Sequence, residues 1–449
     1  MPLAFLSTDV LILILRNLHV QDLESIACSC RFFRAFVLEH GWLEYLRTNP
    51  RPSYSLAKTR ASCSPRASAY YDARTDFAWT QSAFVARPLS HAWNGMLQPA
   101  LAMNPFRLLV AAGNTIYSYK STVSLIEHVS PPMISEGRCR LSRLPAADRD
   151  LTAITFADDS HPDSPLYIGF QDGSLEHATI VERTVDRKPS FLLDRRRVGP
   201  PGQRSDPIRS LSSSQTCLLS LTASGRATLS LTDRRLASSS SIELNTRSWT
   251  SHLCLRASSP FAAFGTSSAT PLTVHAVSED GLRAHPTAIL QPKSKRLTSS
   301  AVYGVTQAPA SSPWGSSPQI LVSGWFDGVV RCYDLRSPLR SSDMGPSTSG
   351  LAPLRPVLNF YVAAGMARHS VVAFWDIRAT NMGWSVHAPA NDPSPVYSII
   401  LESSRLFGVT QSRPFVYDFG PGVTSGSYPR LAQEKGSNPG FYVTTYRHY

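Results

Sequence analysis

The sequence lacks the long apolar runs and paired cysteines that would place it in a membrane or hold it by disulfides. Its longest early apolar run, Val10 to Leu15, is six residues, and a spanning helix needs about 20. No basic residue precedes this run and Asp9 interrupts it, so we do not expect a secretory signal. The seven cysteines show no C-x-x-C spacing, which argues against a disulfide framework or a zinc site. We expect a reduced, intracellular protein in the cytoplasm, the nucleus or both.

The sequence also has little charge, and almost no lysine. Charged residues make up 17% of the chain, below the usual value of about 25%. The net charge is +12, from 44 lysines and arginines against 32 acidic residues, and only six of the 44 are lysines. This balance permits partners such as nucleic acid, phosphate or acidic peptides. Nucleic acid is the weaker choice, because the basic residues are spread over loops without a recognition helix or a stacking platform.

Motifs for catalysis are missing as well. We find no G-x-S-x-G, H-E-x-x-H, P-loop or G-x-G-x-x-G. His161 lies near Asp158 and Asp159, which could bind a metal, but a polar loop explains this turn-rich stretch better. We expect no catalytic residue, metal or cofactor. A hydrolase remains an alternative, and it would need an acid, base or metal set that the sequence does not show.

The first fifty residues are helical in pattern. Ser7 and Thr8 are candidate N-caps, and Leu11, Ile14, Leu15 and Leu18 fall on one helical face. A second helix should begin at Gln21 and Asp22, and a third near Cys30 that ends at Gly41. A unit this small cannot bury all its apolar residues. Some should therefore contact a partner, or else the rest of the chain.

This segment resembles the F-box, a module that binds the Skp-type adaptor of cullin-RING ubiquitin ligases. Ser7 stands where the family usually has proline, and Phe33 where it usually has tryptophan. The resemblance implies a docking surface built from the first helix and the apolar residues of the third. The residues implied are Leu6, Val10, Leu11, Ile14, Leu15, Leu18, Cys30, Phe33 and Trp42.

Residues 48–83 are rich in Pro, Ser and Arg and show no apolar period. We predict a connector here, ordered at most around Tyr70, Tyr71, Phe77 and Trp79. The module would then occupy residues 1–47 and a strand-rich body residues 84–449.

The strand-rich body is built from repeats. Three copies pair two strands across a tight turn and end in an aromatic residue followed by aspartate: Asp334, Asp376 and Asp418, each 42 residues apart. WD repeats have a period of about 40–45 residues. Arg336 and Arg378 close the Asp-x-Arg motifs and should pair within the body. Weaker upstream copies bring the total to seven, at about 47 residues each.

These copies resemble degraded WD repeats, with Trp375-Asp376 the one literal WD pair. Together the two resemblances suggest the F-box/WD-repeat family: a small all-α module followed by an all-β, seven-bladed β-propeller. Asp334, Trp375, Asp376 and Asp418 would be repeat structural residues. Residues 84–87 or residues 440–446 would supply the strand that closes the ring.

One basic stretch, residues 181–204, could bind substrate. Arg195, Arg196 and Arg197 could pair with phosphate, although a solvated loop is the simpler interpretation.

The leading hypothesis is a substrate-recognition subunit of a Skp-cullin-F-box ubiquitin ligase, itself without catalytic activity. The F-box would hold the Skp-type adaptor and cullin, and the propeller a protein substrate that is phosphorylated or not. The alternative is a non-degradative scaffold that binds the adaptor without cullin. Few lysines would spare such a subunit self-modification, although genome-wide base composition would give the same bias.

Overall fold

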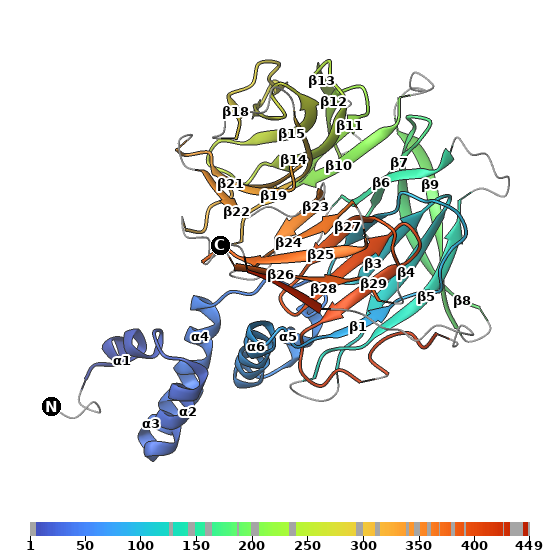
Figure 1. Ribbon diagram of the computed structural model, residues 1–449. Helices are drawn as coiled ribbons and strands as arrows, with labels where there is room; N and C mark the ends of the chain where they lie inside the picture. The colour runs from blue at the N-terminus through green and yellow to red at the C-terminus, as the bar shows by residue number, and fades with distance from the viewer. Residues whose placement is uncertain are drawn as a thin grey trace.

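The structure is a computed structural model. It describes residues 6–124, 129–141, 149–157, 164–185, 188–198, 206–232, 239–292, 300–309, 315–337, 341–344, 351–356, 361–367, 369–378, 382–389, 392–424, 426–431 and 443–447. Helices lie near the N-terminus, and the rest of the described chain is strands and turns (Figure 1). Among these residues, no helix is long and apolar enough to cross a membrane.

The N-terminal helices begin close to where the sequence predicts. Ser7 is the N-cap of the first helix, and Cys30 is the N-cap of the third. In the second, Asp22 accepts a hydrogen bond from the backbone of His19, which helps to fix the helix start. We call these elements the helical module: α1 (Thr8–Leu15), α2 (Val20–Ser29), α3 (Arg31–Phe36), the π-helical turn η2 (Val37–Gly41) and α4 (Trp42–Thr48).

Gly41 does not end the third helix as the sequence suggests. The backbone continues through η2 directly into α4. A Cβ placed on Gly41 would lie 3.0 Å from Val37 and 3.4 Å from both Leu15 and Leu23. Glycine therefore serves close packing here, since it lets α1 and α2 approach this turn.

The segment predicted as a connector contains two further helices, α5 (Ala57–Ser62) and α6 (Pro65–Thr80). Ser64 caps α6 by accepting a hydrogen bond from the backbone of Ala67 at 3.2 Å, and Pro65 occupies the first helical position. A Ser-Pro pair suits a helix start as well as a turn. The Pro- and Ser-rich composition is therefore compatible with ordered structure here.

The remainder forms an all-β domain of antiparallel sheets, and we call it the β-domain. Among the described residues there are four four-stranded sheets, one five-stranded sheet and one nine-stranded sheet. Pairing between β15 and β19 joins two smaller units within the nine-stranded sheet. The strands are β1 (Val85–Pro88), β2 (Ala100–Met103), β3 (Arg107–Ala112), β4 (Thr115–Ser121), β5 (Met133–Arg140), β6 (Leu151–Phe156), β7 (Leu166–Phe170), β8 (Leu175–Val185), β9 (Lys188–Val198), β10 (Ile208–Ser214), β11 (Cys217–Thr222), β12 (Arg226–Leu231), β13 (Ser239–Glu243), β14 (Ser248–Cys254), β15 (Phe261–Ser268), β16 (Leu272–Ser278), β17 (Gly281–Leu282), β18 (Ala288–Leu290), β19 (Ser300–Gln307), β20 (Ile320–Trp325), β21 (Val330–Asp334), β22 (Ser341–Met344), β23 (Leu351–Pro356), β24 (Tyr361–Met366), β25 (Val371–Asp376), β26 (Met382–His387), β27 (Val396–Leu401), β28 (Arg405–Thr410), β29 (Pro414–Asp418) and β30 (Val443–Arg447).

The first strands of successive units contact one another in a closed cycle. β2 contacts β6, and the contacts continue through β10, β14, β19, β23 and β27 back to β2. Apolar clusters lie between consecutive units all the way round. The core of the β-domain is thus a series of apolar layers between neighbouring sheets.

Both candidate closing strands pair with other strands, each in a different sheet. β1 pairs with β29, so a strand from the N-terminal part completes the sheet of β27, β28 and β29. β30 pairs with β26 as the fifth strand of the preceding sheet.

The repeated aspartates end the third strands of their units. Asp334 pairs with Arg336 at 2.8 Å and Asp376 pairs with Arg378 at 2.6 Å, so the prediction that both arginines pair within the β-domain is confirmed. Trp375 is buried between two sheets. Asp418 has no arginine two residues on, and instead pairs with Arg405 at 3.0 Å in a fully buried site.

Candidate protein-docking surfaces

The helical module has its own small core. Leu11, Leu15 and Trp42 are buried in it, together with Leu23 and Val37. These three were expected to meet a partner, but in this arrangement their side chains are covered by the module itself. They can stabilise the helices whose exposed side chains would contact a partner.

The same module leaves other apolar side chains exposed. Val10, Leu13, Phe32, Leu38 and Leu43 are each between 41% and 54% exposed. Only Val10 among these belongs to the predicted set; the other four lie on helix faces that the F-box pattern does not mark. The small module thus exposes several large apolar side chains on four of its elements.

The other predicted docking residues are exposed or partly buried. Cys30 is exposed, and Leu6, Ile14, Leu18 and Phe33 are partly buried. They are therefore accessible at the module surface.

The helical module is fixed to α6. Ala69 of α6 is completely buried in the core of the module, and the rings of Trp42 and Tyr70 lie 5.8 Å apart. Asp76, also on α6, accepts a hydrogen bond from the Arg51 guanidinium at 2.5 Å. Asp72, nearly fully buried, pairs with Arg60 at 2.6 Å.

The opposite side of α6 packs on the β-domain. Trp79 stacks on Phe419 with ring centroids 3.5 Å apart, and its Nε1 donates a hydrogen bond to the carbonyl of Ser403 at 3.2 Å. The Tyr71 hydroxyl lies 2.9 Å from the hydroxyls of both Ser130 and Ser404. Burial raises the pKa of Tyr71 to about 12, so it stays protonated at neutral pH. α6 therefore joins the module to the β-domain through packed contacts.

A second anchor lies just before α5. The Glu402 carboxylate is buried and accepts hydrogen bonds from the backbone N–H of Tyr54 at 2.6 Å and of Ser55 at 3.1 Å. The hydroxyls of Ser53 and Ser55 donate to it as well. These bonds hold residues 53–55 against the β-domain.

The three consecutive arginines of the sequence do not converge. They lie on strand β9, where neighbouring side chains point to opposite faces. Arg195 pairs with Glu176 at 3.0 Å and donates to the carbonyl of Leu141 at 2.6 Å. Arg196 and Arg197 are exposed on opposite faces. All three therefore cannot face one phosphate, because Arg196 lies on the face opposite to Arg195 and Arg197.

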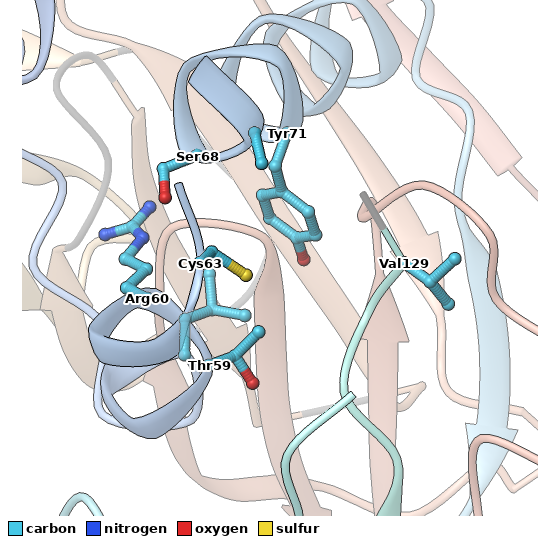
Figure 2. Close-up of a pocket in the computed structure, with 8 residues that line it drawn as sticks. Thr59, Arg60, Cys63, Ser68, Tyr71 and Val129 are labelled. Carbon is cyan, nitrogen blue, oxygen red and sulfur yellow. The ribbon is translucent and has the colours of Figure 1, made fainter. Parts of the chain in front are cut away.

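A small pocket lies between α5, α6 and the segment at Val129 (Figure 2). It encloses about 300 Å³, part of it open to solvent, and Leu56, Ala67 and Tyr71 contribute to its wall. Figure 2 shows the Cys63 thiol and the Tyr71 hydroxyl pointing toward its interior. Its lining brings together no paired acid and base, so we regard it as a gap at the junction of α5, α6 and the β-domain.

Among the described residues, no group of three or more His, Cys, Asp or Glu side chains could hold a metal ion. The sequence candidate of Asp158, Asp159 and His161 lies outside the described residues.

Comparison with known proteins finds no family model that matches this sequence and no curated protein that matches it significantly.

Proposed function

We propose that this chain is a substrate-recognition subunit of a Skp-cullin-F-box ubiquitin ligase. The helical module would bind the Skp-type adaptor and through it the cullin, and the β-domain would bind a protein substrate. Ubiquitin transfer itself would be carried out by the conjugating enzyme and the RING subunit. This chain would contribute proximity, by holding substrate lysines near the charged enzyme.

We further propose that the β-domain is a seven-bladed propeller. Counting the nine-stranded sheet as two units gives seven units, and their first strands contact one another in a closed cycle. Closure of this kind protects the sheet edges that an open array would expose. Pairing of β1 with β29 supports closure by strands from distant parts of the chain.

The observation that carries the docking proposal is the exposed apolar surface of the helical module. Val10 and Leu13 on α1, and Phe32 on α3, are between 41% and 54% exposed although they belong to a packed unit. The F-box resemblance assigns adaptor binding to the same two helices. The exposed side chains offer the apolar area that a partner would bury.

Co-purification tests this proposal. We expect the full chain to retain the Skp-type adaptor and a cullin, and Val10→Glu combined with Phe32→Glu to lose both, because each change buries a charge in the contact. Phe77→Glu is the matched control, since Phe77 is 68% exposed on α6, outside the module. Retention of adaptor and cullin by the double variant at the control level would contradict the docking proposal.

The same experiment separates the ligase from the non-degradative scaffold. The ligase requires that cullin co-purify with the adaptor, and that a protein bound to the β-domain be ubiquitinated by the assembled complex. Recovery of the adaptor without cullin would instead support the scaffold.

A further inference from the structure

Two arginines, Arg209 on β10 and Arg247 just before β14, lie over one tryptophan at one end of the β-domain. The guanidinium carbon of Arg247 lies 4.3 Å from the centre of the Trp249 ring, and that of Arg209 lies 5.8 Å from it. Arg209 is the second residue of β10 and Trp249 the second of β14, two first strands that contact each other (Figure 1). The cluster therefore lies where these strands begin.

Aromatic side chains extend this cluster toward solvent. The rings of Trp249 and Tyr303 lie 5.0 Å apart, and those of Tyr303 and Phe326 lie 6.3 Å apart. Phe326 is in the turn between β20 and β21, where its N–H donates to the carbonyl of Ala301 at 2.8 Å. Its side chain is 58% exposed. A row of rings thus leads from the two cations over Trp249, through Tyr303, to the exposed ring of Phe326.

The charge of the two arginines is not neutralised within the described part of the chain. Among the residues that the structure describes, Arg209 donates a side-chain hydrogen bond to the neutral side chain of Gln98 at 3.0 Å, and no ion pair involves Arg247. The acidic residues nearest to them in sequence have other partners: Asp206 accepts a hydrogen bond from the backbone of Ser224, and Glu243 pairs with Arg226 at 2.6 Å. Two like charges held close without a counter-charge favour an anionic ligand.

We propose that Arg209, Arg247, Tyr303 and Phe326 form a binding site for an acidic peptide in which a carboxylate or phosphate precedes an apolar side chain. The anion would pair with the guanidinium groups, and the apolar side chain would cover Phe326. A base-stacking role is less suited to this site, because Trp249 is already covered by the arginines and by Tyr303. The inference rests on the proposed role of the β-domain as a protein-binding platform, and it names the class of partner.

Fluorescence anisotropy with three labelled decapeptides tests this site on the full chain. The first carries two glutamates followed by leucine and phenylalanine between Gly-Ser ends. The second has glutamine in place of both glutamates, and the third has phosphoserine. We expect the glutamate or the phosphoserine peptide to bind at least about tenfold more tightly than the glutamine peptide, the factor that one charge-assisted hydrogen bond provides. Binding of both anionic peptides indicates a general anion site, and binding of the phosphoserine peptide alone indicates a phosphate site.

Variants locate the site on the protein. Arg247→Ala should weaken binding of the two anionic peptides by about tenfold. Arg247→Lys should restore part of this affinity, because lysine returns the positive charge but not the planar guanidinium. Phe326→Ala should weaken binding of all three peptides by a similar factor, since each peptide carries the same apolar residues. Arg283→Ala is the control, because Arg283 is exposed and pairs with Asp280 at 3.1 Å. Both Arg247 and Phe326 are exposed, so these variants should fold as the wild type does.

Equal binding of the glutamate, phosphoserine and glutamine peptides would overturn the proposal. So would an Arg247→Ala variant that binds like Arg283→Ala, or the absence of any binding at millimolar peptide. The measurement involves no adaptor, so it is independent of co-purification. Normal adaptor binding with no peptide binding refutes this site alone, and the reverse result refutes the adaptor-docking proposal alone.

Discussion

Replacement of Trp79 by alanine should free α6 from the β-domain. Trp79 is 2% exposed, stacks on Phe419 at 3.5 Å and meets Phe374 edge-to-face at 5.5 Å. Truncation of a buried tryptophan to alanine costs about 3–5 kcal/mol. The loss falls on the contact between α6 and the sheets, so local opening of the helix should become easier by about two orders of magnitude or more.

Native-state amide hydrogen exchange measures this directly. We expect exchange in residues 65–80 to accelerate strongly in Trp79→Ala, and exchange in β10 and β11, which share a sheet that Trp79 does not contact, to change little. Trp79→Phe keeps a stacked ring and loses the hydrogen bond to Ser403, which is worth about 1 kcal/mol. Phe77→Ala is the control on the same helix, and its effect should stay within about 0.5 kcal/mol because Phe77 is exposed.

If Trp79→Ala accelerated exchange in α6 no more than Phe77→Ala does, Trp79 would not hold this helix on the β-domain. Equal acceleration in α6 and in β10 would also refute this role, because Trp79 would then stabilise the whole β-domain instead of the docked helix.

Other measurements test single interactions. Arg405→Met should lower the free energy of unfolding by about 3–5 kcal/mol, because it leaves Asp418 buried without its cation; denaturation by urea measures this, and a loss under 1 kcal/mol would contradict it. Burial lowers the pKa of His275 from 6.5, so the unfolded chain takes up a proton that the folded chain does not, and stability should fall as the pH drops below about 6.5. His275→Gln should reduce this dependence of the free energy of unfolding on pH, measured by urea titrations between pH 7 and pH 5. An unchanged pH dependence would contradict the role given to His275. Asp334→Ala should lower the unfolding midpoint more than Arg336→Ala does, since the buried carboxylate also accepts the backbone N–H of residue 336 at 3.0 Å, while the arginine is exposed.

The sequence predicts structure best where an element is fixed by residues that are close together in the chain. Ser7 and Cys30 precede helices as N-cap residues with the extended backbone that a helix start requires, although neither side chain makes a capping hydrogen bond. Asp334 and Asp376 mark strand ends at a fixed period because each carboxylate binds the backbone and the arginine two residues later. Spacing alone is enough to find such motifs.

Contacts between distant segments could not be found in this way. Composition marks residues 48–83 as a connector, and it cannot show that Glu402 receives the N–H groups of Tyr54 and Ser55. Arg209 and Arg247 are 38 residues apart in sequence and carry no shared motif. Only the packing of β10 beside β14 brings them together. Conversely, Arg195 to Arg197 are adjacent in sequence, but the alternation of side chains along a strand places Arg196 on the face opposite to the other two.

The ordered junction bears on the choice between a ligase subunit and a scaffold. A scaffold needs only a tether between its two binding parts, and a flexible segment would serve, with an effective concentration set by its length. This chain instead fixes α6 on both sides, with Ala69 buried in the module and Trp79 buried in the β-domain. Such contacts hold the proposed docking surface of the module at one distance and orientation from the β-domain. Fixed geometry matters most when a bound protein must be presented to a reactive group at a definite place, because positioning then sets the rate of transfer. The packing of α6 therefore favours the ligase subunit over the scaffold. It also predicts that Trp79→Ala will slow ubiquitination of a bound protein while both binding activities persist.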